Sequence, residues 1–205
     1  MNKIPLPHEH IIFPLDVPSL KEAKKYIHLL NDHVGLFKVG LELFVSEGPQ
    51  VMQAIAKESP AKVFLDMKFH DIPETVSGAQ KAANVHGAKF ITVYCDEGSQ
   101  LLRAVVDSVK NGTKVLGITV LTSLSKKDLK DIGICEELQD PRELVLHRAE
   151  IAKRTGCSGV VCSGNEVRAV KEKFGKDFIV VVPGIRPSWG QIQNDDQARI
   201  STPFN

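Results

Sequence analysis

The sequence predicts an α/β fold, specifically a (β/α)₈ TIM barrel, as a single domain over residues 1–205 that is incomplete at its C-terminus. Apolar, β-branched runs alternate with helical segments along the whole chain, and no low-complexity linker interrupts them. Neither a G-x-G-x-x-G motif nor a P-loop follows a predicted strand, which disfavours the usual nucleotide-binding sheets. Polar residues gather where several predicted strands end, and barrel enzymes build their active sites at that edge.

The predicted strands are nearly continuous apolar runs, which is typical of parallel strands covered on both faces. They span residues 10–17, 36–41, 62–68, 89–94, 114–121, 159–162 and 178–183. A closed barrel of this class needs an eighth strand to leave no open edge. We therefore expect the last helix and strand of the barrel to be missing from this sequence.

The helices between these strands have recognisable start and stop signals. Ser19 with Glu22, and Ser163 with Glu166, have the spacing of a capping box. Asp140 is a candidate N-cap, followed by proline at the first helical position. Glycines expected to end helices in a left-handed conformation are Gly35, Gly87, Gly112, Gly156 and Gly175.

Composition excludes several classes of partner. The 26 basic and 25 acidic residues give a net charge of +1, so no overall field recruits nucleic acid or an anionic membrane. No apolar run approaches the ~18–20 residues of a membrane span, and the N-terminus lacks the apolar core of a signal peptide. The four cysteines show no C-x-x-C pair, so we expect a reduced, cytoplasmic protein. The histidines show no zinc-binding spacing, and no metal site is expected.

The run from Phe64 to Pro73 is the most informative part of the chain. Asp66 and Lys68 follow a buried strand, and their spacing of two places both on one face of it. Opposite charges at the end of a buried strand persist when they are paired or used in chemistry. An isolated D-x-K pattern fits a structural ion pair as well as a catalytic pair.

Motifs along the whole chain resemble those of the orotidine 5′-phosphate decarboxylase family, in its bacterial branch. In order, they are residues 15–17 (Leu-Asp-Val), 37–40 (Phe-Lys-Val-Gly), 66–73 (D-x-K-x-x-D-I-P), 121–123 (Leu-Thr-Ser), 183–186 (Pro-Gly-Ile-Arg) and 195–199 (Asp-Asp-Gln-Ala-Arg). The resemblance implies conversion of orotidine 5′-phosphate to UMP, the last step of de novo UMP synthesis. It also implies that no metal or organic cofactor takes part, and that the enzyme is a homodimer with sites at the subunit interface.

The resemblance assigns the catalytic roles to an alternating array of Lys38, Asp66, Lys68 and Asp71. Lys68 is expected to stabilise negative charge at C6 of the pyrimidine and then to donate the proton that replaces CO₂. Asp66 is expected to keep Lys68 charged and to lie close to the substrate carboxylate. Asp71 is expected to reach in from the other subunit.

Substrate-binding roles follow from the same resemblance. Asp16 and Lys38 are expected to contact the ribose hydroxyls, and Thr122 and Ser123 the amide edge of the pyrimidine. The remaining predicted binding residues are Ile72 and Thr75, which line the neighbouring subunit's site, and Arg186 and Gln197, which flank a phosphate-binding loop. The family pattern continues beyond Thr202-Pro203 with a strand whose Gly-Arg holds the phosphate, so this chain is expected to bind phosphate weakly.

Other interpretations remain open. Asp16 fits a simple turn cap, and Thr122 and Ser123 fit ordinary loop hydroxyls. A related barrel group shares D-x-K-x-x-D, namely the magnesium-dependent hexulose-phosphate synthases and ketogulonate-phosphate decarboxylases. The sequence Asp71-Ile72-Pro73 points away from that group, whose run typically ends in D-A-G. A non-catalytic nucleotide-binding barrel is the alternative from another functional class.

Overall fold

The computed structural model describes residues 6–110, 112–187, 189 and 201–203, and it confirms the alternation of strands and helices. The strands are β1 (Ile12–Pro14), β2 (Leu36–Val39), β3 (Lys62–Phe69), β4 (Ala88–Tyr94), β5 (Lys114–Ile118), β6 (Gly159–Val161) and β7 (Ile179–Val181). The α-helices are α1 (Leu20–Leu29), α2 (Leu41–Glu47), α3 (Gln50–Glu58), α4 (Pro73–Val85), α5 (Ser99–Ser108), α6 (Lys126–Asp131), α7 (Pro141–Arg154) and α8 (Val167–Phe174). Short 3₁₀ helices are η1 (Pro7–His10), η2 (Glu136–Leu138) and η3 (Gly164–Glu166).

The chain forms two compact units. One contains residues 1–92 and 107–114, and the other contains residues 93–106 and 115–205. That the whole chain is a single barrel domain stays a prediction.

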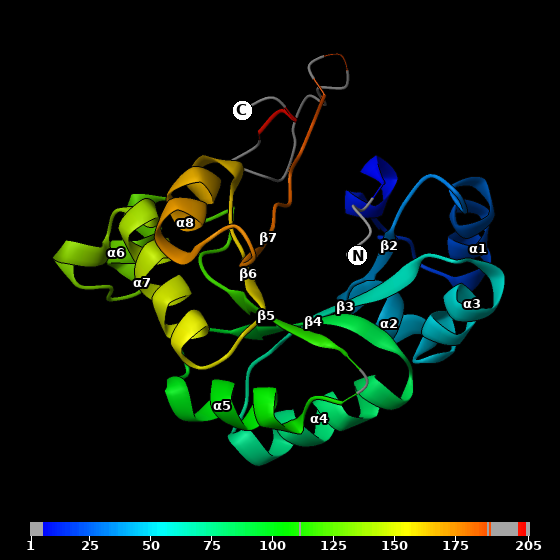
Figure 1. Cartoon of the computed structure of the whole chain (residues 1–205), viewed down its shortest axis with the longest axis horizontal. Helices are drawn as coiled ribbons and strands as arrows, with labels where there is room; N and C mark the ends of the chain where they lie inside the picture. The colour runs from blue at the N-terminus through cyan, green and yellow to red at the C-terminus, as the bar shows by residue number, and fades with distance from the viewer. Residues whose placement is uncertain (1–5, 111, 188, 190–200, 204–205) are drawn as a thin grey trace. The chain divides into compact units, whose positions relative to one another are not determined.

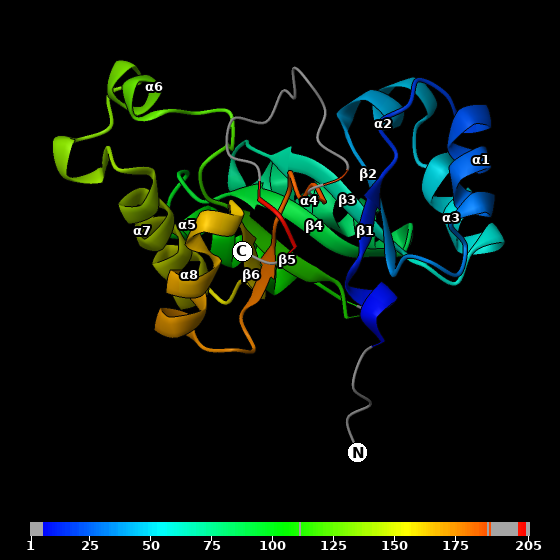
Figure 2. The same cartoon turned by 90° about the horizontal axis from the view of Figure 1, so that it is seen from above.

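The first unit is built on parallel strands that follow one another in sequence order, β1 to β3 and then residues 88–92 of β4. Leu36 of β2 pairs with Ile12 of β1 on one side and with Lys62 of β3 on the other. Helices α1 and α3 pack side by side next to these strands (Figure 1, Figure 2). Strand side chains such as Phe37 and Leu65 are buried, as expected for parallel strands with apolar cover.

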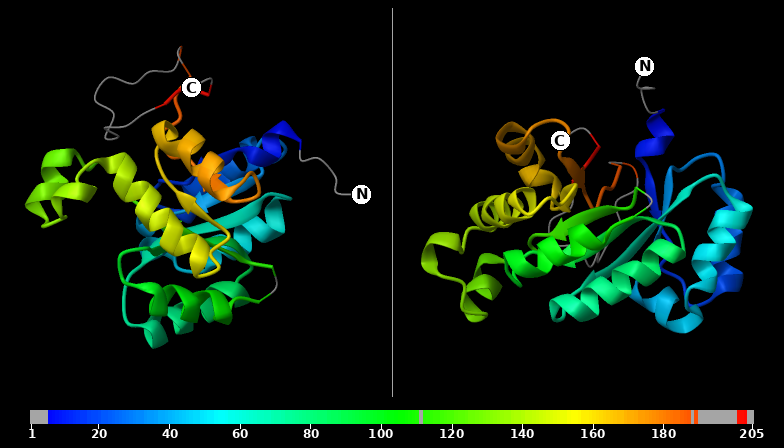
Figure 3. Two further views of the ribbon diagram at one scale, coloured as in Figure 1. Left: turned by 60° about the vertical axis from the view of Figure 1, so that its left-hand side comes forward. Right: turned by 60° about the horizontal axis from the view of Figure 1, so that its bottom comes forward.

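The second unit repeats this plan with β5, β6 and β7, which are parallel and also in sequence order. Helix α7 packs against β6 and against α8 (Figure 3). Strands β6 and β7 approach closely at Gly159, where a Cβ atom would lie 2.1 Å from the carbonyl oxygen of Ile179. Only glycine fits this register without a shift of the backbone.

The first and last strands are shorter than the sequence predicts. Strand β1 ends at Pro14, and β7 begins at Ile179 and ends at Val181. Asp16 therefore lies in the loop after β1 rather than within the strand. Loops at this end of a parallel strand carry the functional side chains of barrel enzymes.

Two of the predicted helix starts are confirmed, and one is displaced. The hydroxyl of Ser19 accepts a hydrogen bond from the Glu22 amide at 3.3 Å. The carboxylate of Asp140 accepts one from the Arg142 amide at 2.8 Å, at the start of α7. Ser163 also caps a helical segment, but this segment is the 3₁₀ turn η3, and α8 begins directly after it at Val167.

The predicted role of Gly35 was wrong. Gly87, Gly112, Gly156 and Gly175 have positive φ angles, as expected after helices, but Gly35 does not. A Cβ atom on Gly35 would lie 2.4 Å from the carbonyl oxygen of Glu9. The residue is glycine because another segment of backbone passes against it.

Candidate active site

Asp66 and Lys68 lie on one face of β3 near its carboxyl end. The Lys68 Nζ donates to Asp66 Oδ2 at 2.9 Å, and the side chains are 30% and 12% exposed, respectively. The alternate residues Leu65, Met67 and Phe69 instead line an apolar pocket of about 250 Å³ together with residues of α3 and α4. The predicted alternation of faces is confirmed, and it separates a charged face from an apolar one.

Thr92 of β4 completes this cluster, and the sequence analysis gave it no role. Its side chain is fully buried, and its hydroxyl donates to Asp66 Oδ1 at 2.9 Å. The same hydroxyl accepts a hydrogen bond from the Lys68 backbone amide at 2.8 Å. In the sequence, the only sign of this role is a threonine within an apolar strand, and a threonine in that position does not reveal which residue it contacts.

Lys68 has a φ angle of 49°, the only positive value of a non-glycine residue in the described part of the chain. A lysine in the left-handed region is strained and persists only where surrounding contacts determine it. Such strain is concentrated at functional sites, so the backbone marks this residue independently of its charge.

Lys38 and Asp16 form a second ion pair at the ends of β2 and β1. The Lys38 Nζ lies 2.8 Å from Asp16 Oδ1, with the Lys38 side chain 21% and the Asp16 side chain 61% exposed. In the sheet register Lys38 is the neighbour of Phe64, two residues before Asp66. A Cβ atom on Gly40 would lie 3.0 Å from Lys38 Nζ and 3.4 Å from Asp16 Oδ1, so this glycine leaves room for the pair.

Asp71, Ile72 and Thr75 are all exposed at the start of α4. The Asp71 Oδ1 accepts a hydrogen bond from the Ile72 amide at 2.7 Å, and Ile72 is 66% exposed. Within the described residues of one chain, Asp71 forms no ion pair with Lys68. The structure therefore brings Asp66 to Lys68 but does not add Asp71 to them.

The other predicted binding residues lie in the second unit. Thr122 is buried and Ser123 is exposed in the loop after β5. The Arg186 amide donates to the Ser201 carbonyl at 2.9 Å, and its side chain is half-buried. Gln197 lies outside the described residues.

A buried ion pair in the second unit, which residue spacing did not predict, connects the loops that follow β4 and β5. Arg148 of α7 is buried; it donates to the Thr119 carbonyl and, at 2.8 Å, to Asp96 Oδ2. The guanidinium thereby joins the segments that follow β4 and β5. Its partners lie 52 and 29 residues away in the chain, so spacing gave no sign of them.

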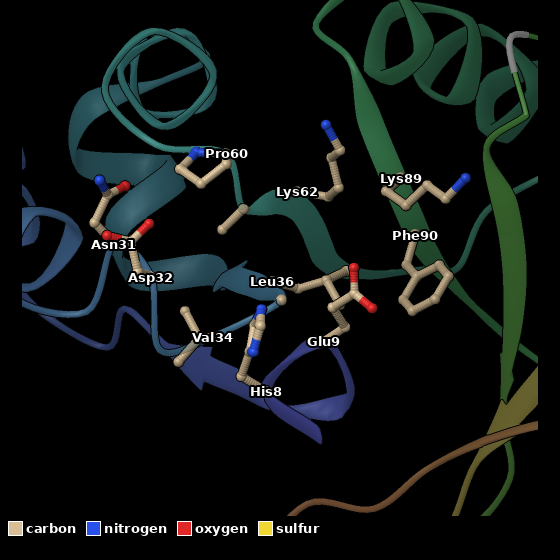
Figure 4. Close-up of a pocket in the computed structure, with 12 residues that line it drawn as sticks. His8, Glu9, Asn31, Asp32, Val34, Leu36, Pro60, Lys62, Lys89 and Phe90 are labelled. Atoms are coloured by element: carbon tan, nitrogen blue, oxygen red, sulfur yellow. The ribbon is translucent and has the colours of Figure 1, made fainter. Parts of the chain in front are cut away.

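A pocket of about 440 Å³ lies at the opposite, amino-terminal ends of the strands (Figure 4). It is lined by residues of η1, by residues that follow α1, and by Lys62 and Lys89 at the starts of β3 and β4. None of the predicted site residues lines it. In a barrel enzyme the chemistry takes place at the carboxyl ends of the strands, and we place the candidate site there.

Among the residues that the structure describes, no group of three or more His, Cys, Asp or Glu side chains is placed to hold a metal ion. None of the described helices is long and apolar enough to cross a membrane.

Comparisons with known proteins identify the family of this chain. The model of the family "Orotidine 5′-phosphate decarboxylase / HUMPS family" matches residues 9–204. The chain is 47% identical to the orotidine 5′-phosphate decarboxylase of Desulfosudis oleivorans, covering 96% of this chain and 80% of that protein. It is 42% identical to the enzyme of the same name from Gloeothece citriformis, covering 97% of this chain and 84% of the relative.

Solved structures show the same likeness. The crystal structure of orotidine 5′-phosphate decarboxylase from Lactobacillus acidophilus matches with a TM-score of 0.78 and 37% identity, covering 86% of this chain and 81% of the other. An uncharacterized conserved protein from Geobacillus kaustophilus matches with a TM-score of 0.77 and 33% identity, covering 84% and 82%. The predicted barrel class is thereby confirmed. On sequence and on structure, the chain belongs to the orotidine 5′-phosphate decarboxylase / HUMPS family.

Proposed function

We propose that this protein decarboxylates orotidine 5′-phosphate to UMP in pyrimidine biosynthesis, without a metal or organic cofactor. The observation that carries the proposal is the Lys68 ammonium held 2.9 Å from Asp66 at the carboxyl end of β3. The high identity to relatives that bear this enzyme's name supports it. The reaction belongs to metabolism in the cytoplasm, and we propose that location for the protein.

The chemistry requires charge stabilisation at one carbon. When the bond between C6 and the carboxylate breaks, the electron pair stays on C6 and CO₂ leaves. The Lys68 ammonium stabilises that negative charge and then transfers a proton to C6, which yields UMP. Asp66 keeps the ammonium in place, and its negative charge next to the substrate carboxylate favours loss of CO₂.

The proposal also assigns substrate-binding roles to residues outside this pair. Asp16 and Lys38 hold the ribose hydroxyls, since their ion pair presents both acceptors and donors. Thr122 and Ser123 contact the amide edge of the pyrimidine. Arg186 and Gln197 bind the phosphate, whose binding energy can be used at the reacting carbon.

The proposal includes a homodimer. Asp71, with Ile72 and Thr75, is assigned to the site of the partner subunit, where it completes the alternating array with Lys38, Asp66 and Lys68. The exposure of all three residues supports this assignment. So does the exposed apolar side chain of Ile72, which favours burial against another surface.

The experiment is a turnover assay that follows the loss of orotidine 5′-phosphate absorbance. Lys68→Ala should lower kcat by several orders of magnitude, because the charge and the proton donor are both lost. Lys62→Ala is the matched control, since Lys62 is exposed at the other end of the same strand. Near-normal activity of Lys68→Ala would contradict the mechanism.

Two further arms separate the alternatives. Activity that survives EDTA rules out the magnesium-dependent hexulose-phosphate synthases and ketogulonate-phosphate decarboxylases. Binding of UMP without turnover of orotidine 5′-phosphate would instead identify a non-catalytic nucleotide-binding barrel.

A further inference from the structure

We infer that Thr92 is a positioning residue that holds Asp66 and Lys68 in their reactive arrangement, an inference that rests on the function proposed above. Thr92 is fully buried on β4 and contacts both members of the pair. It donates no proton to substrate and therefore acts only through its two neighbours.

The hydrogen-bond chemistry of one hydroxyl accounts for both contacts. A threonine hydroxyl has one proton to donate and lone pairs with which to accept. The proton goes to Asp66 Oδ1 at 2.9 Å, and a lone pair receives the Lys68 amide at 2.8 Å. With Lys68 Nζ on Oδ2, both carboxylate oxygens of Asp66 are held, which fixes the rotation of the carboxylate.

The layer below gives the hydroxyl no competing partner. Phe64 and Phe90 precede Asp66 and Thr92 by two residues on their strands, and their rings meet edge to face with centroids 6.0 Å apart. The two rings are apolar and offer the hydroxyl neither a hydrogen-bond donor nor an acceptor. The Thr92 hydroxyl is therefore directed to the carboxylate above it.

The backbone of Lys68 needs a contact of this kind. Its φ of 49° is unfavourable for lysine, and it is stabilised by the bond from its amide to Thr92. Removal of the hydroxyl would leave that amide without its acceptor and relax the turn that directs Nζ toward Asp66. Carboxylate and ammonium are thus aligned through one side chain.

Packing alone would favour a different residue at this position. Ile91 and Val93 flank Thr92, and valine has the same branched shape without a polar atom. A buried hydroxyl costs free energy unless its hydrogen bonds are made. Its presence in the middle of an apolar strand is explained by the Asp66 and Lys68 contacts.

The test compares Thr92→Val, which removes only the hydroxyl, with Thr92→Ser, which keeps it. Thr92→Val should lower kcat about tenfold to a hundredfold, the range expected for hydrogen bonds to charged groups. KM should stay within about threefold, because the binding groups are untouched. Thr92→Ser should retain most of the kcat of the parent chain.

Thr113→Val is the matched control for stability. Thr113 is another buried threonine, and its hydroxyl donates to the Ala88 carbonyl at 2.6 Å, away from the predicted site residues. Amide hydrogen exchange at Lys68 is the second readout. It should accelerate in Thr92→Val and remain as in the parent chain in Thr92→Ser and Thr113→Val.

Each outcome is decisive. Unchanged kcat in Thr92→Val, or an equal loss of kcat in Thr113→Val, overturns the positioning role. An inactive parent chain overturns the proposed function instead. The hydrogen-exchange measurement still tests the inference in that case. If the Lys68 amide exchanges at the same rate in Thr92→Val as in the parent chain, the inference is overturned as well. If exchange accelerates in Thr92→Val alone, the result supports the role of Thr92 in aligning the pair.

Discussion

The Asp71 carboxylate accepts a hydrogen bond from the amide of the next residue, Ile72, at 2.7 Å, and both residues are exposed. This bond fixes the direction of the carboxylate at the start of α4. Asp71 therefore has a fixed, exposed carboxylate that does not pair with Lys68 of its own chain. This arrangement fits a role in the site of a neighbouring subunit. The arrangement leads to a prediction that mixed dimers can test.

Co-expressed Lys68→Ala and Asp71→Ala chains should regain activity that each variant lacks alone. In a mixed dimer, one site combines the intact Lys68 of one chain with the intact Asp71 of the other. Random pairing should restore about a quarter of the sites, because half of the dimers are mixed and each has one intact site. Turnover of orotidine 5′-phosphate by the purified mixture measures the recovery.

Two controls accompany this measurement. Each variant expressed alone sets the background, and native mass spectrometry of the purified mixture measures the share of mixed dimers. No recovery in a mixture shown to contain mixed dimers means that Asp71 serves its own subunit.

Gly159→Ala should destabilise the protein by about 1–3 kcal/mol, the usual cost of forcing an atom into a packed interior. The added Cβ would lie 2.1 Å from the Ile179 carbonyl oxygen, so the β6–β7 pairing must shift. Urea unfolding measures the change.

Gly78→Ala is the matched substitution with the opposite expected sign. Gly78 lies within α4, and a Cβ atom there would meet nothing within 4 Å. It should stabilise by about 0.5–1 kcal/mol through helix propensity. If the two substitutions change the free energy of unfolding equally, the close approach of the strands at Gly159 does not destabilise an alanine there.

Acid should remove part of the stability through Glu58, which links α3 to α1. The hydrogen bond from Lys24, at 2.6 Å, lowers the pKa of the Glu58 carboxyl from its ordinary value of 4.5, and His28 adds to the effect. Because the folded-state pKa is depressed, this stabilisation is present above about pH 4.5 and is lost as the pH falls through the lowered value.

Glu58→Gln should accordingly flatten the acid limb of the stability curve. The measurement is the urea unfolding free energy at several pH values between neutral and acidic. Lys24→Met should remove the same component, and the double variant should add little to either single change. If the unfolding free energy falls equally steeply with decreasing pH in the parent chain and in Glu58→Gln, Glu58 is not the source of the acid sensitivity.

The four cysteines should differ sharply in reactivity. Cys135 is exposed, whereas Cys95, Cys157 and Cys162 are buried. Burial raises the pKa of the Cys157 thiol to about 11 and also raises the pKa of the Cys95 thiol, so neither forms the reactive thiolate near pH 8.

Maleimide labelling of the native protein at pH 8 should therefore modify one thiol rapidly and the other three only after unfolding. Mass spectrometry of peptides identifies the site, and Cys135→Ser should abolish the fast phase. Rapid native labelling of Cys95 or Cys157 would contradict the burial of these thiols.

Local sequence determined the parts of this protein that depend on neighbours in the chain. Apolar runs separated by capped helical segments predicted the strand and helix order, because burial on both faces of a parallel strand leaves an apolar stretch. The two-residue repeat of a strand placed Asp66 and Lys68 on one face. The motif order then identified the family and the four charged residues proposed for catalysis.

Only the tertiary structure decided which residues of other segments support that pair. Thr92 meets Asp66 across 26 residues of sequence, and Gly35 is a glycine because the backbone of Glu9 passes beside it. Such contacts depend on the register between strands and on the path of loops, and residue spacing specifies neither. The positive φ of Lys68 is of the same kind, since it is the surrounding hydrogen bonds, and not lysine's own preference, that hold it.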